Sequence, residues 1–191
     1  MTSARGEAIL DAQRLLQLRP VYLDTETTGL GPDAEIIEIG IIDHDGSLLY
    51  SSLVRPKSSR IEPDAQRLHG ITLQHLQDAP DWNKVWIQVQ TLLSGRRVGV
   101  YNAEFDLRLM RQSHKKYFLP WTVPEQDFAC IMKLYARFRG EWDSRRGSFR
   151  YQSLDSAGQQ CGIRIPNSHR AIEDARLARA VLEHIASQAA R

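Results

Sequence analysis

The stretch VYLDTETTG, residues 21–29, places an apolar run directly before two acidic side chains. Side chains alternate between the two faces of a β-strand, so a strand from Val21 to Glu26 turns Asp24 and Glu26 to the same face. Two carboxylates this close repel each other, and the arrangement becomes favourable if a cation lies between them. The stretch therefore predicts the end of a buried strand that carries a cation site.

The segments on both sides of this strand predict an α/β fold. Further strands are expected at residues 36–43, 48–54 and 98–101, and Asp45-Gly46 indicates a tight turn between the first two of these. Helices are expected at residues 8–18, 82–93, 103–114, 128–138, 154–162 and 170–186, with Asp81, Asp127 and Ser153 as N-caps of three of them. Three strands in a meander, followed by alternating helices and strands, predict a mixed sheet flanked by helices.

Two further carboxylates fall on helix faces that are otherwise apolar. Asp106 shares a face with Leu109 and Met110, which follow it by three and four residues. Asp174 lies inside the apolar stripe of the last helix, whose other members are Ala171, Ala175, Ala178, Val181, Leu182 and Ile185. An unpaired buried carboxylate is costly, so such residues are usually paired or coordinate a metal.

The combined set of carboxylates indicates metal-assisted chemistry on a phosphodiester. Oxygen ligands suit hard cations such as Mg²⁺ or Mn²⁺. Two such ions about 3.5–4 Å apart can clamp a phosphodiester during in-line displacement. His169 precedes Asp174 by five residues, and Pro166-Asn167-Ser168 indicates that the last helix begins just after His169. A histidine in that loop could take the proton from the attacking water.

Composition limits the remaining possibilities. The 191 residues suffice for one buried core, so we expect a single domain, with residues 1–19 as a helical extension and 20–187 as the catalytic core. The net charge of +2 is too small to indicate a nucleic-acid partner by itself. Cys130 and Cys161 lie among apolar residues and predict no disulfide. Without a signal peptide or a membrane-spanning run, a cytoplasmic protein with no membrane partner is expected.

At these residues the sequence resembles the DEDDh branch of the DnaQ-like exonuclease superfamily. The family's three motifs occur in order as residues 24–29, 101–106 and 169–175, and Leu68-His69-Gly70-Ile71-Thr72 is similar to the family's segment over the terminal nucleotide. The resemblance implies an RNase H-like fold, in which a mixed five-stranded sheet combines an antiparallel three-stranded meander with parallel strands. It also implies two bound Mg²⁺ or Mn²⁺ ions.

The resemblance assigns roles to individual residues. The implied metal ligands are Asp24, Glu26, Asp106 and Asp174, and the implied general base is His169. The residues implied to contact the 3′ end of the substrate are Thr27, Leu68, His69, Asn102 and Phe105. For His69, a structural hydrogen bond stays open beside substrate contact, and for Glu38 a structural hydrogen bond is the favoured interpretation. His114 is expected to be solvated.

The implied activity is a 3′→5′ exonuclease that releases nucleoside 5′-monophosphates from DNA, single-stranded or frayed. An exoribonuclease that trims RNA ends is an alternative, because discrimination rests on contacts to the 2′-OH. A subunit recruited to a polymerase or repair complex is another. The chain stops within a few residues of the final helix, which argues against a tail that tethers a polymerase, whereas a surface-bound partner and a homodimer stay open.

The sequence departs from the family pattern in two places. Tyr101 stands where many members have histidine before the asparagine of the second motif, a position that holds no metal. Residues 137–151 form a longer segment in which five arginines alternate with aromatic residues. Such a segment can track phosphates and stack bases, or it can be a solvated loop with incidental aromatics.

Overall fold

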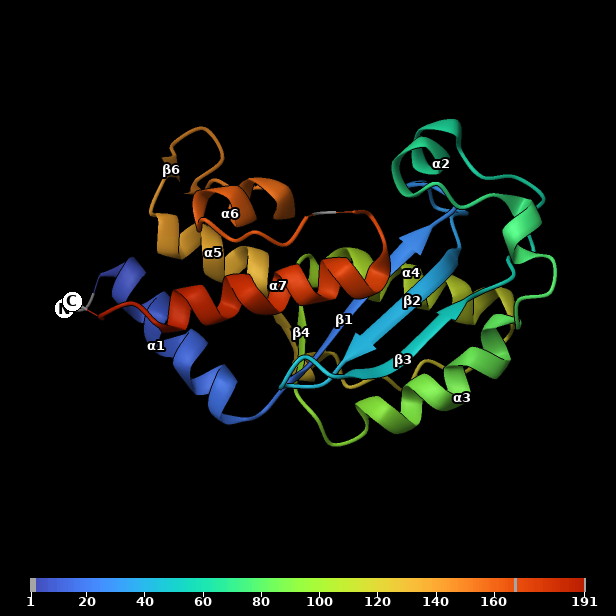
Figure 1. Cartoon of the computed structure of the whole chain (residues 1–191), viewed down its shortest axis with the longest axis horizontal. Helices are drawn as coiled ribbons and strands as arrows, with labels where there is room; N and C mark the ends of the chain where they lie inside the picture. Colours follow the sequence, from blue (N-terminus) through green and yellow to red (C-terminus); the bar gives the residue numbers. More distant parts are fainter. Residues whose placement is uncertain (1–2, 167, 191) are drawn as a thin grey trace.

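A mixed five-stranded sheet forms the centre of the molecule in the computed structural model, which describes residues 3–166 and 168–190 (Figure 1). The strands are β1 (Val21–Thr27), β2 (Ile36–Ile42), β3 (Leu48–Leu53), β4 (Val98–Val100) and β5 (Phe128–Cys130), in the order β3-β2-β1-β4-β5. The first three pair antiparallel, and β4 and β5 run parallel to β1. The predicted RNase H-like fold class is confirmed, while Asn167 of the predicted loop lies outside the described residues.

Helices cover both faces of the sheet. They are α1 (Ala4–Gln17), α2 (Pro63–His69), α3 (Trp82–Leu93), α4 (Ala103–Lys116), α5 (Ile131–Arg139), α6 (Leu154–Gln160) and α7 (Ala171–Ala186). Tyr22 of β1 packs with α1, α5 and α7, whereas Val21 and Leu23 pack with α3 and α4 on the other face. This alternation makes each face of β1 part of a separate apolar core. None of the described helices is long and apolar enough to cross a membrane.

Close packing fixes the start of α7 on β2. A Cβ atom at Gly40 would lie 2.8 Å from the backbone of Ala171 and Ile172, so only glycine allows this approach. Glu38 accepts hydrogen bonds from Arg170 Nη2 at 2.6 Å and from the backbone N–H of Ala171 at 3.0 Å. The structural hydrogen bond predicted for Glu38 is therefore present, and it anchors the helix that carries Asp174.

Two helix predictions need correction. The helix expected at residues 128–138 begins only at Ile131, because Phe128–Cys130 pairs with β4 as a parallel strand. Asp127 consequently lies in a short 3₁₀ turn and does not cap α5. Asp81 does occupy the N-cap position of α3, but its carboxylate accepts hydrogen bonds from the Arg55 guanidinium, at 3.1 and 2.9 Å, instead of capping the backbone. The predicted cap at Ser153 is confirmed by a 3.1 Å bond from Ser156 N.

His114 is the clearest departure from the expected surface. Its side chain was expected in solvent but is fully buried between α3 and the segment that follows α4. Its ring centroid lies 5.7, 4.4 and 4.9 Å from those of Trp82, Trp86 and Trp121. Burial lowers the pKa of this imidazole below its usual value. His114 is therefore part of the α3–α4 core.

Candidate active site

Asp24 and Glu26 lie in the second half of β1, beyond the part of the strand that pairs with β4. That pairing ends at Tyr22 and Gly99, so both carboxylates follow the last paired residue. They share the face of Tyr22, which α7 covers. Glu26 is buried and Asp24 is half-buried. The edge of β1 that faces β4 is therefore unpaired from Asp24 onward.

Asp174 approaches the same place from the first turn of α7. Its carboxylate is buried and accepts backbone hydrogen bonds from Ser168 and His169. The possible ligand atoms of Glu26, His169 and Asp174 all lie within 4.8 Å of one another, and His169 Nδ1 is 3.9 Å from Asp174 Oδ2. His169 has a positive φ of 51°, a conformation that histidine adopts more readily than bulkier side chains do. The predicted convergence of these three residues is therefore present.

Asp106 reaches the site from the opposite layer, in the first turn of α4. Its side chain is buried, and Thr25 donates its hydroxyl to Asp106 Oδ1 at 2.7 Å. Thr25 lies between Asp24 and Glu26 but faces the other side of the sheet. One short strand thus presents two carboxylates to α7 and a hydroxyl that fixes a third carboxylate on α4.

The four carboxylates share one electrostatic environment. Burial and then repulsion from Asp106, Glu26 and Asp174 raise the pKa of Asp24 well above its usual value. Burial is also the main cause that raises the pKa of Glu26 to about 8, of Asp106 to about 7 and of Asp174 to about 6. A divalent cation among these oxygens would offset both burial and repulsion, so the donor set fits Mg²⁺ or Mn²⁺.

A pocket of about 400 Å³ adjoins these carboxylates. It is lined by Thr25, Glu26, Thr27, Leu30, Glu62, Asp64, Ala65, Leu68, His69 and Phe105. Four of the predicted substrate-binding residues therefore meet around one cavity. The fifth, Asn102, is exposed at the N-cap of α4 and does not line it. The apolar side chains of Leu68 and Phe105 offer surfaces on which a base can pack.

His69 joins the wall of this pocket to β1. The backbone N–H of Ile71 donates to His69 Nδ1 at 3.0 Å, so Nε2 carries the proton and donates to Thr27 O at 3.2 Å. Burial lowers the pKa of this imidazole, which keeps the neutral form. The structural hydrogen bond that sequence reasoning left open is thus present, and it holds the backbone of Thr27 at the pocket.

Sequence reasoning missed five residues that line this pocket, which are Thr25, Leu30, Glu62, Asp64 and Ala65. Thr25 could have been found from strand alternation, which turns its hydroxyl toward α4. Leu30 and Glu62 come from the loops before β2 and α2, and no local pattern indicates that these loops meet at the pocket. Their places follow from the tertiary fold alone.

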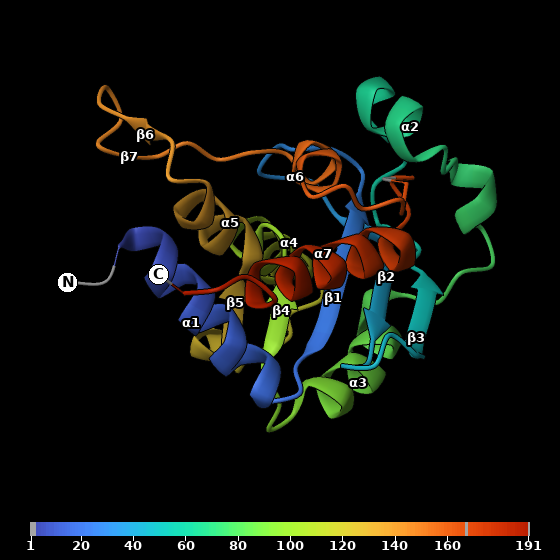
Figure 2. The ribbon, with the colours of Figure 1, turned by 60° about the vertical axis from the view of Figure 1, so that its left-hand side comes forward.

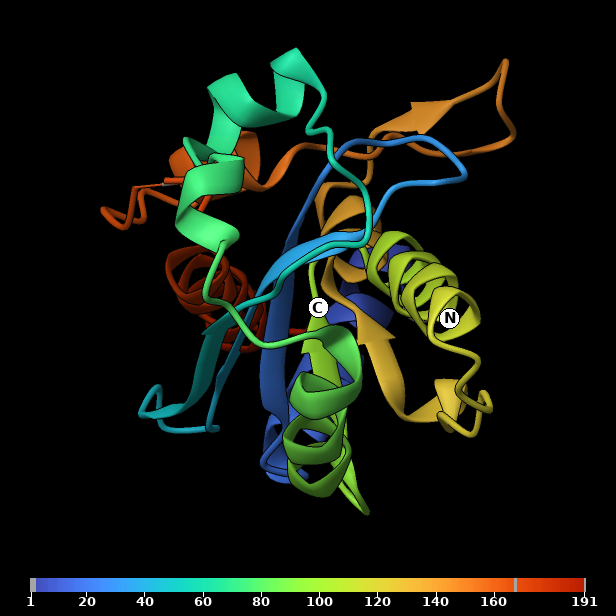
Figure 3. The ribbon, with the colours of Figure 1, turned by 90° about the vertical axis from the view of Figure 1, so that its right-hand side faces the viewer.

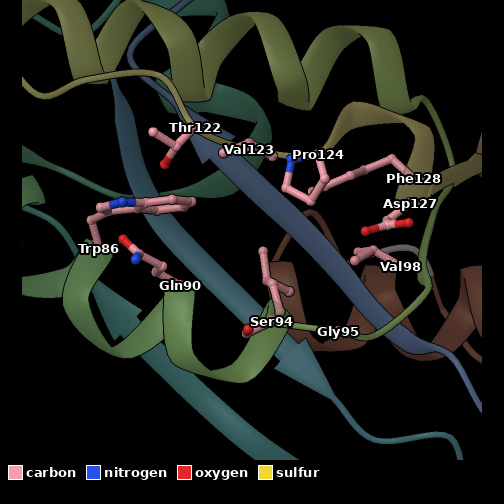
Figure 4. A pocket seen from close by; sticks show the side chains of 11 residues that line it. Trp86, Gln90, Ser94, Gly95, Val98, Thr122, Val123, Pro124, Asp127 and Phe128 are labelled. Carbon is pink, nitrogen blue, oxygen red and sulfur yellow. The ribbon is translucent and has the colours of Figure 1, made fainter.

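A second pocket, of about 270 Å³, lies at the start of β4 and β5 (Figure 4). This is the end of these strands that lies away from the carboxylates. Trp86, Gln90, Thr122, Val123 and Phe128 are among its lining residues. It contains one carboxylate, Asp127, which pairs with Arg97 at 3.4 Å. Without the remaining acidic residues, this pocket cannot perform the chemistry that the carboxylate cluster can.

Comparisons with known proteins agree with this geometry. The exonuclease family that includes RNase T matches residues 21–182. A protein of Escherichia phage 186, described as an uncharacterized exonuclease, is 35% identical over 181 residues, with 92% of each chain covered. The DNA polymerase III subunit epsilon of Pasteurella multocida is 29% identical over 177 residues, and the match covers 87% of this chain and 66% of that subunit.

Solved structures share the fold. Exonuclease X in complex with 5′ overhanging duplex DNA has a TM-score of 0.61 at 27% identity, covering 89% of this chain and 94% of that one. Escherichia coli exonuclease I in complex with a dA16 oligonucleotide has a TM-score of 0.65 at 17% identity. That match covers 84% of this chain but only 39% of exonuclease I, and it shows the fold alone.

Proposed function

Because the chain belongs to the RNase T exonuclease family, within the DnaQ-like superfamily, we propose that it removes nucleotides one at a time from the 3′ end of a DNA strand. Residues 20–187 form the proposed catalytic core. The observation that carries the proposal is the convergence of Glu26, His169 and Asp174 within 4.8 Å, beside Asp24, whose pKa is raised by burial and by repulsion from Asp106. Products are a nucleoside 5′-monophosphate and a strand that is one nucleotide shorter.

Four carboxylates hold the metal ions in this proposal. Asp24, Glu26, Asp106 and Asp174 together provide enough oxygen ligands for two Mg²⁺ or Mn²⁺ ions. When bound, such ions supply a water of lowered pKa and stabilise the departing 3′-oxygen. The raised pKa values of the carboxylates support this assignment. Burial and mutual repulsion disfavour the ionised carboxylates, and bound cations would offset both effects.

His169 is the proposed general base. Its side chain is 35% exposed, so a water molecule can reach the imidazole, and Asp174 lies beside it. The imidazole accepts a proton as the water oxygen attacks phosphorus, and the bond from phosphorus to the 3′-oxygen breaks. The departing 3′-oxygen takes a proton from solvent and becomes the new 3′-hydroxyl, and His169 returns the proton it gained to solvent.

The pocket beside Glu26 is the proposed site of the terminal nucleotide. A volume of about 400 Å³ lies within the usual range for small-molecule sites. In this proposal Leu68 and Phe105 pack on the last bases, and the backbone at Thr27 binds the 3′ end. The imidazole ring of His69, which bonds to Thr27 O, also contacts the nucleotide. Asn102, exposed at the start of α4, contacts the strand just outside the pocket.

DNA is preferred over RNA in this proposal because exonuclease X, at 27% identity, is in complex with DNA. An exoribonuclease is the alternative, and comparing rates on matched DNA and RNA strands separates the two. The similarity to polymerase III subunit epsilon supports a polymerase or repair assembly as a partner.

End-labelled strands test the polarity directly. With Mg²⁺ or Mn²⁺, a 5′-labelled strand should give a ladder of shortening products, whereas a 3′-labelled strand should release its label as a mononucleotide at the first step. EDTA should stop both. A ladder from the 3′-labelled strand would mean digestion from the other end and would overturn the proposal, as would activity that persists in EDTA.

A further inference from the structure

The arginine-rich segment between α5 and α6 is an ordered hairpin. β6 (Trp142–Asp143) and β7 (Ser148–Phe149) pair antiparallel, with Trp142 opposite Phe149. The rings of that pair meet edge to face, 5.2 Å between centroids. Asp143 caps the turn by accepting hydrogen bonds from the backbone N–H groups of Arg145 and Arg146, at 3.0 and 3.3 Å. The segment, for which the sequence left open both nucleic-acid contact and a solvated loop, therefore has a defined hairpin structure.

The hairpin carries positive charge and an aromatic ring into solvent. Within residues 3–166 and 168–190, Arg145 and Arg150 have no carboxylate partner within salt-bridge distance. Arg146 is 75% exposed and its nearest carboxylate, Asp143, is 3.8 Å away. Trp142 is 59% exposed. Guanidinium groups beside an exposed aromatic are the combination that follows a nucleic-acid backbone and stacks on its bases.

The hairpin is tied to the end of β4. Tyr101, which follows β4, donates its hydroxyl to Gln152 O at 3.0 Å, with Ser153 O at 3.2 Å. Gln152 in turn donates to Glu141 Oε2 at 3.3 Å, at the other side of the hairpin base. Tyr101 lies five residues before Asp106. The two departures from the family pattern, Tyr101 and the long segment, are therefore linked through Gln152.

The hairpin also rises from the end of the molecule that holds the carboxylates. Figures 2 and 3 show the β6–β7 hairpin, α6 and α2 at the end to which β1 points. The loop between β1 and β2 runs below the hairpin in Figure 3. A strand that enters the pocket beside α2 can therefore cross this end of the molecule toward the hairpin.

We propose that the β6–β7 hairpin is a nucleic-acid-binding arm, which contacts phosphates of the substrate strand upstream of its terminal nucleotide. Arg145, Arg146 and Arg150 bind the phosphates, Trp142 stacks on a base, and Tyr101 positions the arm. The position of the arm along the strand rests on the proposed function, because that function places the 3′ end in the pocket. The binding of nucleic acid by the arm does not depend on turnover.

Salt-dependent binding of a labelled single strand tests the arm, measured by fluorescence anisotropy with EDTA present so that the strand stays intact. Each neutralised phosphate contributes about 0.7 to the slope of log affinity against log salt for single strands, so Arg145→Ala/Arg146→Ala should reduce this slope by about 1.4. Arg14→Ala/Lys84→Ala removes two exposed positive charges on α1 and α3 and is the matched control, with an unchanged slope expected.

Strand length gives a second, independent measurement. The hairpin variant should weaken binding of a long strand but not of a nucleoside 5′-monophosphate, which would occupy only the pocket. Tyr101→Phe, which keeps the ring and removes the hydroxyl, should reproduce part of the long-strand loss. Equal slopes for the hairpin variant and the control would overturn the proposal and would favour an acidic protein as the partner of this surface. Because the arm is measured without turnover, its failure and the failure of the exonuclease proposal remain distinguishable.

Discussion

The Thr25 hydroxyl donates to Asp106 Oδ1 at 2.7 Å, joining β1 to α4 inside the carboxylate cluster. Thr25 faces the side of the sheet opposite to Asp24 and Glu26, so its contribution is to orient Asp106. Residues that orient metal ligands commonly affect metal affinity or activity by about 10- to 100-fold when replaced.

Thr25→Val should therefore weaken Mn²⁺ binding and activity by about 10- to 100-fold, because valine keeps the shape and lacks the hydroxyl. Mn²⁺ titration of the purified protein measures the affinity. Thr25→Ser, which retains the donor, is the matched control. Equal affinities for the valine and serine variants would show that the hydrogen bond has no part in holding Asp106.

Gly40→Ala should displace the start of α7, since the new Cβ would meet the backbone of Ala171 and Ile172 at 2.8 Å. Overpacking of this kind costs about 1–3 kcal/mol in the free energy of unfolding. Activity should fall as well, because Asp174 moves with the helix. Urea unfolding and the initial rate of strand shortening report the two effects. Gly31→Ala is the control, since its Cβ would meet only Glu62 Oε1, at 3.8 Å; similar losses in both variants would contradict the packing argument.

His169→Asn should lower turnover by about 10²- to 10⁴-fold, the usual contribution of a general base, while strand binding changes little. Asparagine tolerates the left-handed backbone found at His169, where φ is 51°, so the loop should keep its shape. Single-turnover rates and anisotropy measure the two quantities separately. Parallel losses in binding and turnover would instead mark His169 as a structural residue.

Stability should depend on pH and metal together. The pKa values of Glu26, Asp106 and Asp174 rise to about 8, 7 and 6 on folding, so between about pH 4 and pH 8 the metal-free folded state binds more protons than the unfolded state. The free energy of unfolding of the metal-free protein should therefore decrease as the pH rises through this window. Metal binding requires ionised carboxylates, so the increase in Tm on adding Mn²⁺ should grow with pH. An increase in Tm that is constant from pH 5 to pH 8 would contradict this linkage.

Periodicity in the sequence predicted the acidic site because each carboxylate interrupts a local pattern. Asp24 and Glu26 follow from the two-residue repeat of a strand, and Asp174 follows from the apolar stripe of a helix. The strand at Phe128–Cys130 was missed because it is short, it is continuous in sequence with α5, and its pairing with β4 is nonlocal. His114 was placed on the surface because nothing local shows that three tryptophan rings enclose it.

Contacts between distant segments account for the rest of the unpredicted features. The hydrogen bond from Tyr101 to Gln152 joins residues far apart in the chain, and no spacing rule relates them. The same holds for the loop residues Leu30 and Glu62, which meet at the pocket. Strand and helix periodicity identifies a carboxylate at an otherwise apolar position, whereas tertiary packing determines which other residues surround it.

The central claim is that Asp24, Glu26, Asp106 and Asp174 together bind two catalytic cations. Anomalous scattering from crystals soaked in Mn²⁺ with a bound strand tests it most directly. Two peaks within coordination distance of these four carboxylates, lost in Asp24→Asn crystals, are the predicted result. Peaks that appear instead at Asp43, His44 and Asp45, the other group of possible ligands among the described residues, would contradict the claim.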